Sequence, residues 1–190
     1  MELTKVIVER RTRRKFTKEK VSYEKLKTLI EYARFAPMGA NIQGLKYAIV
    51  DDDTLVEKIF PFTAWSGYHP EDAPSENEKP TSYIAILGDT DIKPNGNFET
   101  DAGAAGTIIS LVAEDMGIAS CWIGSINKKE ISILLNLEEK YKLLYLIAIG
   151  YSNQKATYVD ATDNDIKYFT DSNGVLNVPK RKTEDILIKL

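Results

Sequence analysis

The chain has 190 residues, 43% hydrophobic and 28% charged, with a formal net charge of −3 at pH 7, so we expect one domain spanning residues 1–190 around one core. One cysteine and one histidine argue against a zinc cluster and against Ser-His-Asp catalysis, and we predict no metal site. The acidic balance argues against nucleic-acid binding, and because no apolar run could span a bilayer and no signal-peptide pattern is visible, we expect a cytoplasmic protein without membrane partners.

The first predicted element is a short amphipathic helix that leads into a basic run. Leu3, Val6 and Ile7 recur at the spacing of one helix face. The stretch "ERRTRRKF", residues 9–16, then places four arginines and a lysine within eight residues. These cations repel one another unless an anion lies among them, and a guanidinium fits phosphate oxygens two at a time. From the residues alone, a solvated helix end, a localisation-like patch and an anion site all stay open.

A second helix and a turn-rich loop follow. Ser22 is the expected N-cap of a helix that ends before Pro37 and has an apolar face made of Leu26, Leu29, Ile30 and Ala33. The loop "PMGANIQG", residues 37–44, has small residues that let its backbone approach a ligand, and an ordinary helix-to-strand connection stays open as the alternative. Residues 45–50 predict a strand, and the aspartates at 51–53 are expected to cap a helix that carries Leu55, Ile59 and Phe60.

The segment at residues 61–80 predicts a long surface loop. It contains four prolines and several acidic residues, together with Trp65 and Tyr68. Loops of this length inside a compact domain are usually functional or disordered, so the segment is a candidate lid, with a disordered surface loop as the alternative. Its histidine, His69, is expected to be exposed. The apolar run at residues 82–87 then predicts a central strand.

The strongest helix signal spans residues 99–116 and ends at Gly117. Two more strands are predicted at residues 118–124 and 142–151, with a short helix at 128–137 between them. Cys121 is expected to be a core residue. In the polar tail beyond, Asn173-Gly174 predicts a type I′ hairpin turn. Strands separated by helices predict an α/β or α+β sandwich.

Four motifs, in order along the chain, resemble those of the FMN-dependent nitroreductase superfamily. "RRTRRKF" is similar to its opening arginine motif, and "APMGANIQGLKYAIV" to its loop and first strand. "DAGAAGTIISLVAEDMGIASCWIGSI" resembles its central helix and the strand that follows, and "VPKRKTEDILI" its basic closing segment. The stretch "WSGYHPEDAPSENEKPTSYIAIL", residues 65–87, also resembles that of a compact subgroup known as nitroreductases or NADH oxidases. Each motif is short, but the ordered set spans nearly the whole chain.

The resemblance implies an α+β fold, a nitroreductase-like α/β sandwich whose central, mostly antiparallel sheet is flanked by helices, in an intertwined homodimer. One FMN would lie at each end of the interface, with both subunits contributing to each site. Residues from about 151 to 190 would extend to the partner subunit and to the FMN phosphate. By position, the implied FMN-binding residues are Arg10, Arg11, Thr12, Arg14, Pro37, Met38, Gly39, Asn41, Trp122, Gly124, Ser125, Lys180 and Arg181.

These residues carry different implied roles. The arginines and Thr12 grip the phosphate and ribityl chain, the loop at 37–41 covers the flavin of the partner subunit, and the turn after Trp122 presents its backbone to the ring. Lys180 and Arg181 match a phosphate clamp, although they lack the one-residue gap that is usual in the family. Arg13 and Lys15 occupy variable positions of the opening motif and are expected to face solvent.

The activity that the resemblance implies is that of an FMN-dependent NAD(P)H oxidoreductase. In a ping-pong cycle, a hydride passes from NAD(P)H to flavin N5 and then to a nitroaromatic, quinone or similar small-molecule acceptor. The flavin carries this chemistry, so no catalytic side chain is predicted; Trp65 and Tyr68 are the candidates for a lid that selects the acceptor. One alternative is another flavin reaction on the same fold, such as dehalogenation, azoline oxidation or flavin-consuming chemistry. A second is a non-enzymatic regulator that binds flavin or another anion.

Overall fold

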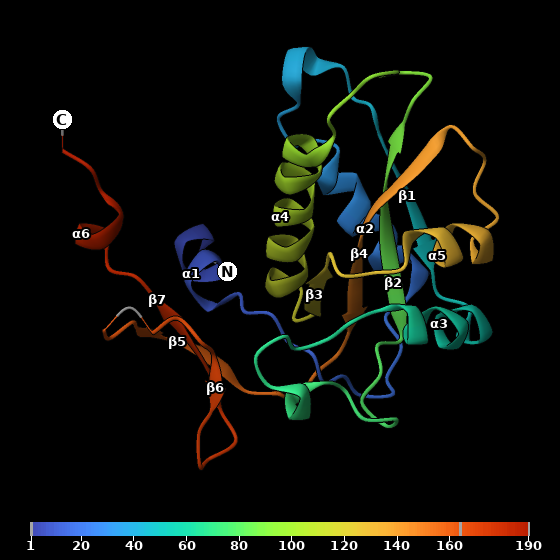
Figure 1. Ribbon diagram of the computed structural model, residues 1–190. Helices are drawn as coiled ribbons and strands as arrows, with labels where there is room; N and C mark the ends of the chain where they lie inside the picture. Colours follow the sequence, from blue (N-terminus) through green and yellow to red (C-terminus); the bar gives the residue numbers. More distant parts are fainter. Residues whose placement is uncertain (1, 164, 190) are drawn as a thin grey trace.

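The computed structural model describes residues 2–163 and 165–189, and its centre is a four-stranded antiparallel sheet (Figure 1). The strand order is β1 (Leu45–Val50), β2 (Ser82–Asp89), β4 (Tyr141–Gly150) and β3 (Ala119–Ile123). Every residue of β2 is buried, as expected of a central strand. The predicted α+β architecture with an antiparallel central sheet is therefore confirmed.

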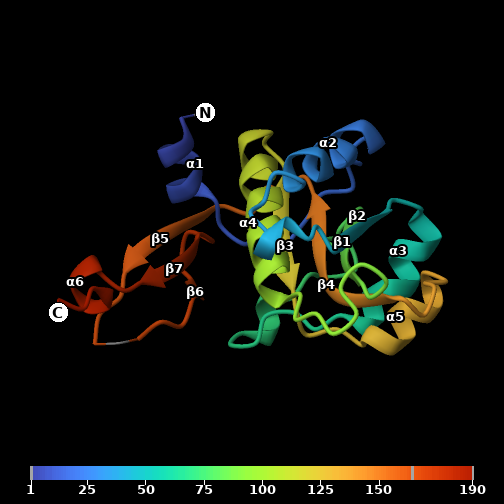
Figure 2. The same ribbon diagram turned by 90° about the horizontal axis from the view of Figure 1, so that it is seen from above.

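Helices cover both faces of this sheet (Figure 2). The helices α2 (Tyr23–Ala33) and α4 (Glu99–Asp115) pack on one face, and α3 (Asp53–Ile59) and α5 (Lys128–Leu134) pack on the other. Side chains alternate along each strand. In β2, for example, Ile84 and Ile86 join the core under α2 and α4, whereas Tyr83, Ala85 and Leu87 join the other core.

The helix starts follow local capping chemistry. The Ser22 hydroxyl accepts from the Lys25 amide at 3.4 Å, and the Asp52 carboxylate accepts from the Leu55 amide at 2.9 Å. Each bond satisfies an amide that has no partner inside its helix. The predicted starts of α2 and α3 are confirmed on that basis. No helix among the described residues is long and apolar enough to cross a membrane.

The first helix, α1 (Leu3–Glu9), lies where the sequence predicts it, but most of its apolar face is exposed. Only Val6 is buried, while Leu3 and Ile7 are 66% and 51% exposed. The helix lies beside α4 and β5 at the border of the main body (Figures 1 and 2). The expected apolar face therefore exists, but within this chain only one of its three residues is covered.

The tail forms a second, smaller sheet, of which only the hairpin around Asn173-Gly174 was predicted from the sequence. It contains β5 (Ala156–Asp160), β6 (Phe169–Thr170) and β7 (Leu176–Lys180), in the order β5-β7-β6, and is followed by α6 (Thr183–Ile186). Strand β5 pairs with β7 in parallel, with Asp160 opposite Lys180. This sheet and α6 project from the main body on the side of α1 (Figure 2).

The hairpin between β6 and β7 has a different turn from the predicted one. A type I′ turn needs positive φ at both central residues. Here Gly174 has φ of 73°, and Asn173 lies outside the left-handed region. The Asp171 carboxylate accepts from the Asn173 and Val175 amides, both at 2.9 Å. These bonds favour a right-handed turn that closes on the left-handed Gly174, so the type I′ prediction is wrong.

Candidate functional site

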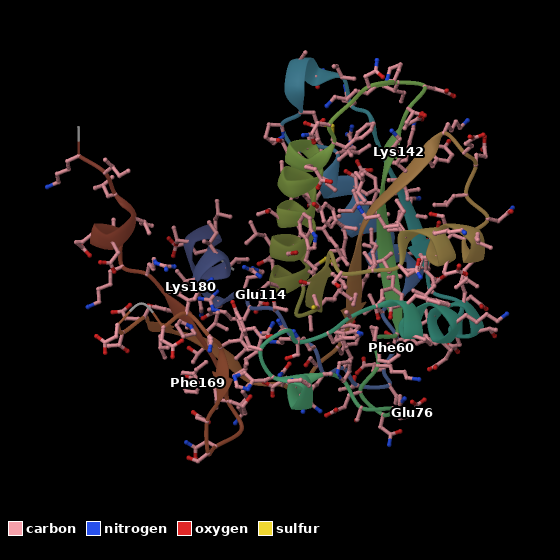
Figure 3. The ribbon with its side chains drawn as sticks, in the orientation of Figure 1. Phe60, Glu76, Glu114, Lys142, Phe169 and Lys180 are labelled. Atoms are coloured by element: carbon pink, nitrogen blue, oxygen red, sulfur yellow. The ribbon has the colours of Figure 1, made fainter. Side chains whose placement is uncertain are left out.

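The two basic segments of the sequence meet in one pocket of about 730 Å³. Arg10 and Arg11 follow α1 directly, and Lys180 ends β7 (Figure 3). Contact between α1 and β5, together with the pairing of β5 with β7, brings these distant segments together. The pocket is lined by five cations and by both aliphatic and acidic neighbours: Arg10, Arg11, Lys180, Arg181, Lys182, Ile7, Val8, Tyr158, Asp160, Thr183 and Glu184.

Arg11 is the buried cation of this group. It is 7% exposed, its guanidinium carbon lies 5.3 Å from the centroid of the Tyr158 ring, and its Nε atom has no hydrogen-bond partner. One terminal nitrogen donates to the Arg10 carbonyl oxygen. Burial, followed by repulsion from Arg10, lowers the pKa of Arg11. A largely buried guanidinium with a positive neighbour and no carboxylate partner favours an anion nearby.

Lys180 lies in the same positively charged environment as Arg11. Its pKa is lowered, first by burial and then by the charges of Arg11 and Arg10. None of the five cations forms an ion pair within 4.0 Å with a carboxylate of a described residue. A doubly charged phosphate in the pocket would remove this repulsion.

A smaller cavity of about 120 Å³ adjoins Arg10 and leads toward the sheet. Hydroxyl groups dominate its lining, which consists of Arg10, Thr12, Thr107, Ser110, Ser120 and Trp122. A side chain at Gly106 could not be accommodated beside it, because a Cβ atom there would lie 2.0 Å from the Trp122 ring. Gly106 of α4 therefore lets the indole of β3 pack closely. The predicted residues Arg10, Thr12 and Trp122 are brought together in this way.

The turn after β3 is exposed and anchored at both ends. Gly124 and Ser125 are exposed, and the Ser125 carbonyl accepts from the Ala64 amide at 2.9 Å. Beneath Gly124 lies Tyr145, whose ring centroid is 5.0 Å from that of Trp122. The Tyr145 hydroxyl donates to the Glu99 carboxylate, and this bond raises the pKa of Tyr145. Tyr145 was not predicted from the sequence, because nothing in a buried strand pattern distinguishes one tyrosine from its neighbours.

Arg13 corrects one sequence expectation. Instead of facing solvent, it donates to both carboxylate oxygens of Glu114, at 2.5 and 3.1 Å, and the two side chains are only 19% and 11% exposed. Glu114 lies at the C-terminal end of α4 (Figure 3). Arg13 thus clamps the basic run to that end of the helix. Lys15 is half-buried, 4.0 Å from Glu78.

Arg14 lies against the tail and does not line the pocket of about 730 Å³. Its guanidinium carbon is 4.6 Å from the centroid of the Tyr168 ring, and its amide donates to Gln154 at 2.9 Å. Tyr168, which the sequence analysis did not single out, links this arginine to the loop at 61–80. Its hydroxyl lies 3.2 Å from the Ser66 hydroxyl, and its ring centroid is 5.2 Å from that of Tyr68.

The two lid candidates occupy different environments. Trp65 faces inward, stacked on Phe60 at 5.8 Å and edge-on to Phe16 at 6.4 Å, whereas Tyr68 is 50% exposed. His69 is half-buried, with its ring 6.0 Å from that of Tyr168, so the expectation of an exposed histidine is wrong. Trp65 therefore anchors the segment, and Tyr68 is the candidate that a ligand could reach.

The loop that begins at Pro37 lies at the other end of α4. Its short 3₁₀ turn, Gly39–Asn41, is exposed, and the Gly39 amide donates to Asp101 in the first turn of α4 at 3.2 Å. Thirteen residues separate Asp101 from Glu114, which corresponds to about 20 Å along the helix. Within one chain, the structure therefore does not bring Pro37, Met38, Gly39 and Asn41 together with the cations around Lys180 (Figure 1).

The sequence is similar to a known protein family and to a named protein. A protein-family model described as the nitroreductase family matches residues 7–81 and 78–151. A protein of Archaeoglobus fulgidus, provisionally named an NADH dehydrogenase/NAD(P)H nitroreductase, is 23% identical over 168 residues, which cover 85% of this chain and 92% of that protein.

Solved structures share the fold. A nitroreductase from Clostridium difficile R20291, named as FMN-dependent, has a TM-score of 0.69 at 25% identity and covers 88% of this chain and 98% of its own. A provisionally named nitroreductase from Desulfovibrio desulfuricans, solved in complex with FMN, has a TM-score of 0.74 at 20% identity and covers 100% and 97% of the two chains. The family match, which extends over most of the sequence and includes the first three motifs, shows that this chain belongs to the nitroreductase family of oxidoreductases.

Proposed function

We propose that this protein is an FMN-dependent NAD(P)H oxidoreductase that reduces a nitroaromatic, a quinone or a similar acceptor. The observation that carries the proposal is the convergence of five cations on one pocket, with the buried Arg11 Nε lacking a partner. Such a site fits the phosphate of FMN in charge and in donor geometry. When bound, FMN would supply the redox chemistry: its ring would accept a hydride from NAD(P)H and pass it to an acceptor that binds over the same ring.

The residues around the pocket would divide the work of binding. Arg10, Arg11, Lys180 and Arg181 would hold the phosphate, and the hydroxyls beside Arg10, including that of Thr12, would receive the ribityl chain. The exposed turn of Gly124 and Ser125 would present backbone groups to the ring, where an N–H donor stabilises added electron density. Arg14, which does not line this pocket, stays a prediction as a contact of the phosphate and ribityl chain, and Tyr68 stays a prediction as part of a lid.

We propose that each complete site needs a second copy of the chain. The loop at residues 37–41 and the cationic pocket lie at opposite ends of α4, so one chain does not unite them. Two uncovered apolar surfaces support the pairing. One is a groove of about 460 Å³ whose apolar lining is Leu3, Val6, Tyr32, Leu111, Val112 and Met116; the other is the tail, where Ile186, Leu187 and Ile188 are 66%, 60% and 82% exposed. Surfaces of this kind mark interfaces.

The absorbance spectrum of the purified protein tests the proposal. The expected result is a flavin spectrum that bleaches when NADH or NADPH is added and recovers when a nitroaromatic or quinone is added. A flavin that stays oxidised with both nicotinamides would contradict the proposed reaction. A flavin that is reduced but not reoxidised by these acceptors would favour another flavin reaction. Protein that does not bind added FMN would overturn the cofactor assignment itself.

A further inference from the structure

We propose that Asp101 is the positioning residue that fixes the loop at residues 37–41 in the conformation that covers the flavin. The inference rests on the proposed function, because the loop matters only if an FMN lies beneath it. Asp101 opens the motif of the central helix, but it is not among the FMN-binding residues that the resemblance implies. The structure points to it because it combines deep burial with two bonds of different kinds.

The geometry of Asp101 leaves it little freedom. It lies in the first turn of α4 and is 4% exposed. One carboxylate oxygen accepts from the Gly39 amide at 3.2 Å, and the other accepts from the Lys93 ammonium at 3.2 Å. A buried carboxylate is tolerated when it is paired and hydrogen-bonded in this way. The ion pair therefore holds the carboxylate in place, and the carboxylate holds the loop.

Lys93 is itself anchored, which makes the arrangement rigid. Its ammonium donates to the Asn97 carbonyl at 2.8 Å and lies 5.4 Å from the centroid of the Phe98 ring. Residues 93–98 lead directly into α4. The loop at 37–41 is thus tied, through Asp101, to the helix start and to the segment before it.

The loop needs such a tie because its backbone is strained. Ala40, Asn41 and Gln43 have φ values of 48°, 53° and 54°, a region that costs energy for residues with a side chain. Its own backbone bonds run from the Asn41 amide to the Met38 carbonyl and from the Ile42 amide to the Gly39 carbonyl, and the Gln43 side-chain amide donates to the Asn41 carbonyl at 3.4 Å. Backbone strain of this kind persists only where the surroundings enforce it.

The direction of the bond assigns Asp101 its role. Because the Gly39 amide points inward to Asp101, the exposed residues 39–43 present their other side to solvent, where a second subunit would sit. Asp101 would contact no flavin atom. It would act through Gly39 on the flavin of the partner subunit, which makes it a positioning residue and not a catalytic one.

The test compares three variants of the full-length protein by FMN dissociation constant, measured by fluorescence titration, and by thermal stability. Asp101→Ala removes both bonds, and we expect the dissociation constant to rise about tenfold or more, the loss typical of a charge-assisted bond. Asp101→Asn keeps an oxygen for the Gly39 amide, and we expect affinity within about threefold of the parent protein. Lys93→Met removes the ion pair and keeps the bond to the Gly39 amide. It should therefore lower the melting temperature, while the FMN dissociation constant rises less than in Asp101→Ala.

Asp53→Ala is the matched control, because Asp53 is also an acidic residue in the first turn of a helix and pairs with a lysine, Lys20, at 2.6 Å. It should leave the FMN dissociation constant unchanged. Hydrogen exchange of the peptide at residues 37–44, in protein without FMN, should accelerate in Asp101→Ala and stay slow in Asp101→Asn. If Asp101→Ala binds FMN as the parent does, or if its exchange is unchanged, the positioning role is wrong while the proposed function stands. If the parent itself binds no FMN, both fall together.

Discussion

At the scale of single residues, we expect Arg11 to lower the stability of the flavin-free protein and to raise its affinity for FMN. Its guanidinium is buried beside Arg10, and its Nε atom has no partner. We expect Arg11→Met to stabilise the flavin-free protein against urea by about 1 kcal/mol, because a desolvated, unpaired cation is removed. The same change should weaken FMN binding by about 1.5–3 kcal/mol, the range for a charged hydrogen bond.

Unfolding curves with and without FMN measure both effects in one experiment. Arg13→Met is the control, since Arg13 is paired with Glu114 and not with the pocket. It should destabilise the protein in both conditions. An Arg11→Met protein that is less stable without FMN would show that Arg11 has a structural role in place of a binding one.

Lys180 gives a prediction for pH. Its pKa in the flavin-free fold lies below the ordinary value of 10.5, so its proton is lost earlier than in the unfolded chain as pH rises. The unfolded state then binds more protons, and Lys180 contributes stability that increases through the alkaline window below 10.5. Phosphate binding favours the charged form, so FMN affinity should fall as pH rises through the same window. Lys180→Arg should flatten this decline, since arginine stays charged; equal slopes for the two proteins would contradict the assignment.

Sequence reasoning located the charged residues better than their partners. A run of four arginines is visible as repulsion that favours an anion, and the resemblance to the nitroreductase superfamily added Lys180 to the same expected site as Arg10 and Arg11. Arg13 was set apart from them by the motif, but it was wrongly expected to face solvent, because its partner, Glu114, lies 101 residues away on α4. Asp101, Tyr145 and Tyr168 were missed for the same reason. Each has its role only through contacts made across the fold.

At the scale of elements, helix α4 contains two glycines that differ in the space available for a side chain. A Cβ atom at Gly106 would lie 2.0 Å from the Trp122 ring, whereas at Gly103 it would meet nothing within 4 Å. We expect Gly106→Ala to lower the free energy of unfolding by about 1–3 kcal/mol through overpacking. Gly103→Ala should raise it by about 0.5–1 kcal/mol, the helix-propensity gain of alanine. Urea denaturation of the two proteins measures the contrast, and equal effects would show that Trp122 can shift without cost.

Elements governed by local chemistry were the predictable ones. Neighbouring residues alone determine several features that are confirmed: the N-caps Ser22 and Asp52, the apolar run of β2 and the end of α4 before Gly117. The prediction for Asn173-Gly174 failed because the Asp171 carboxylate outweighs the intrinsic preference of the dipeptide. The parallel pair of β5 and β7 was missed because such pairing is specified by long-range packing.

At the scale of the whole molecule, the predicted FMN-binding residues lie at the two ends of α4, and this separation makes a test of the proposed homodimer available. Arg10→Ala should damage the phosphate pocket, and a bulky replacement in the loop, Gly39→Trp, should block the flavin cover. Each homodimer then carries two defective sites. In a mixed dimer with two-fold symmetry, one site receives both intact halves and the other receives both defects. Random exchange of subunits should therefore restore about a quarter of all sites, read as FMN bound and as NAD(P)H-dependent bleaching.

The control mixes Arg10→Ala with Lys180→Ala, two changes in the same pocket. Here every site in the mixed dimer carries one defect, so no flavin binding should return, although subunits exchange equally well. Restoration in the first mixture and not in the second would require that the pocket around Lys180 and the loop at residues 37–41 come from different chains. If neither mixture recovers while mass measurements confirm that mixed dimers form, the site lies within one subunit. The distance of about 20 Å along α4 would then have to be closed by a rearrangement of the chain itself.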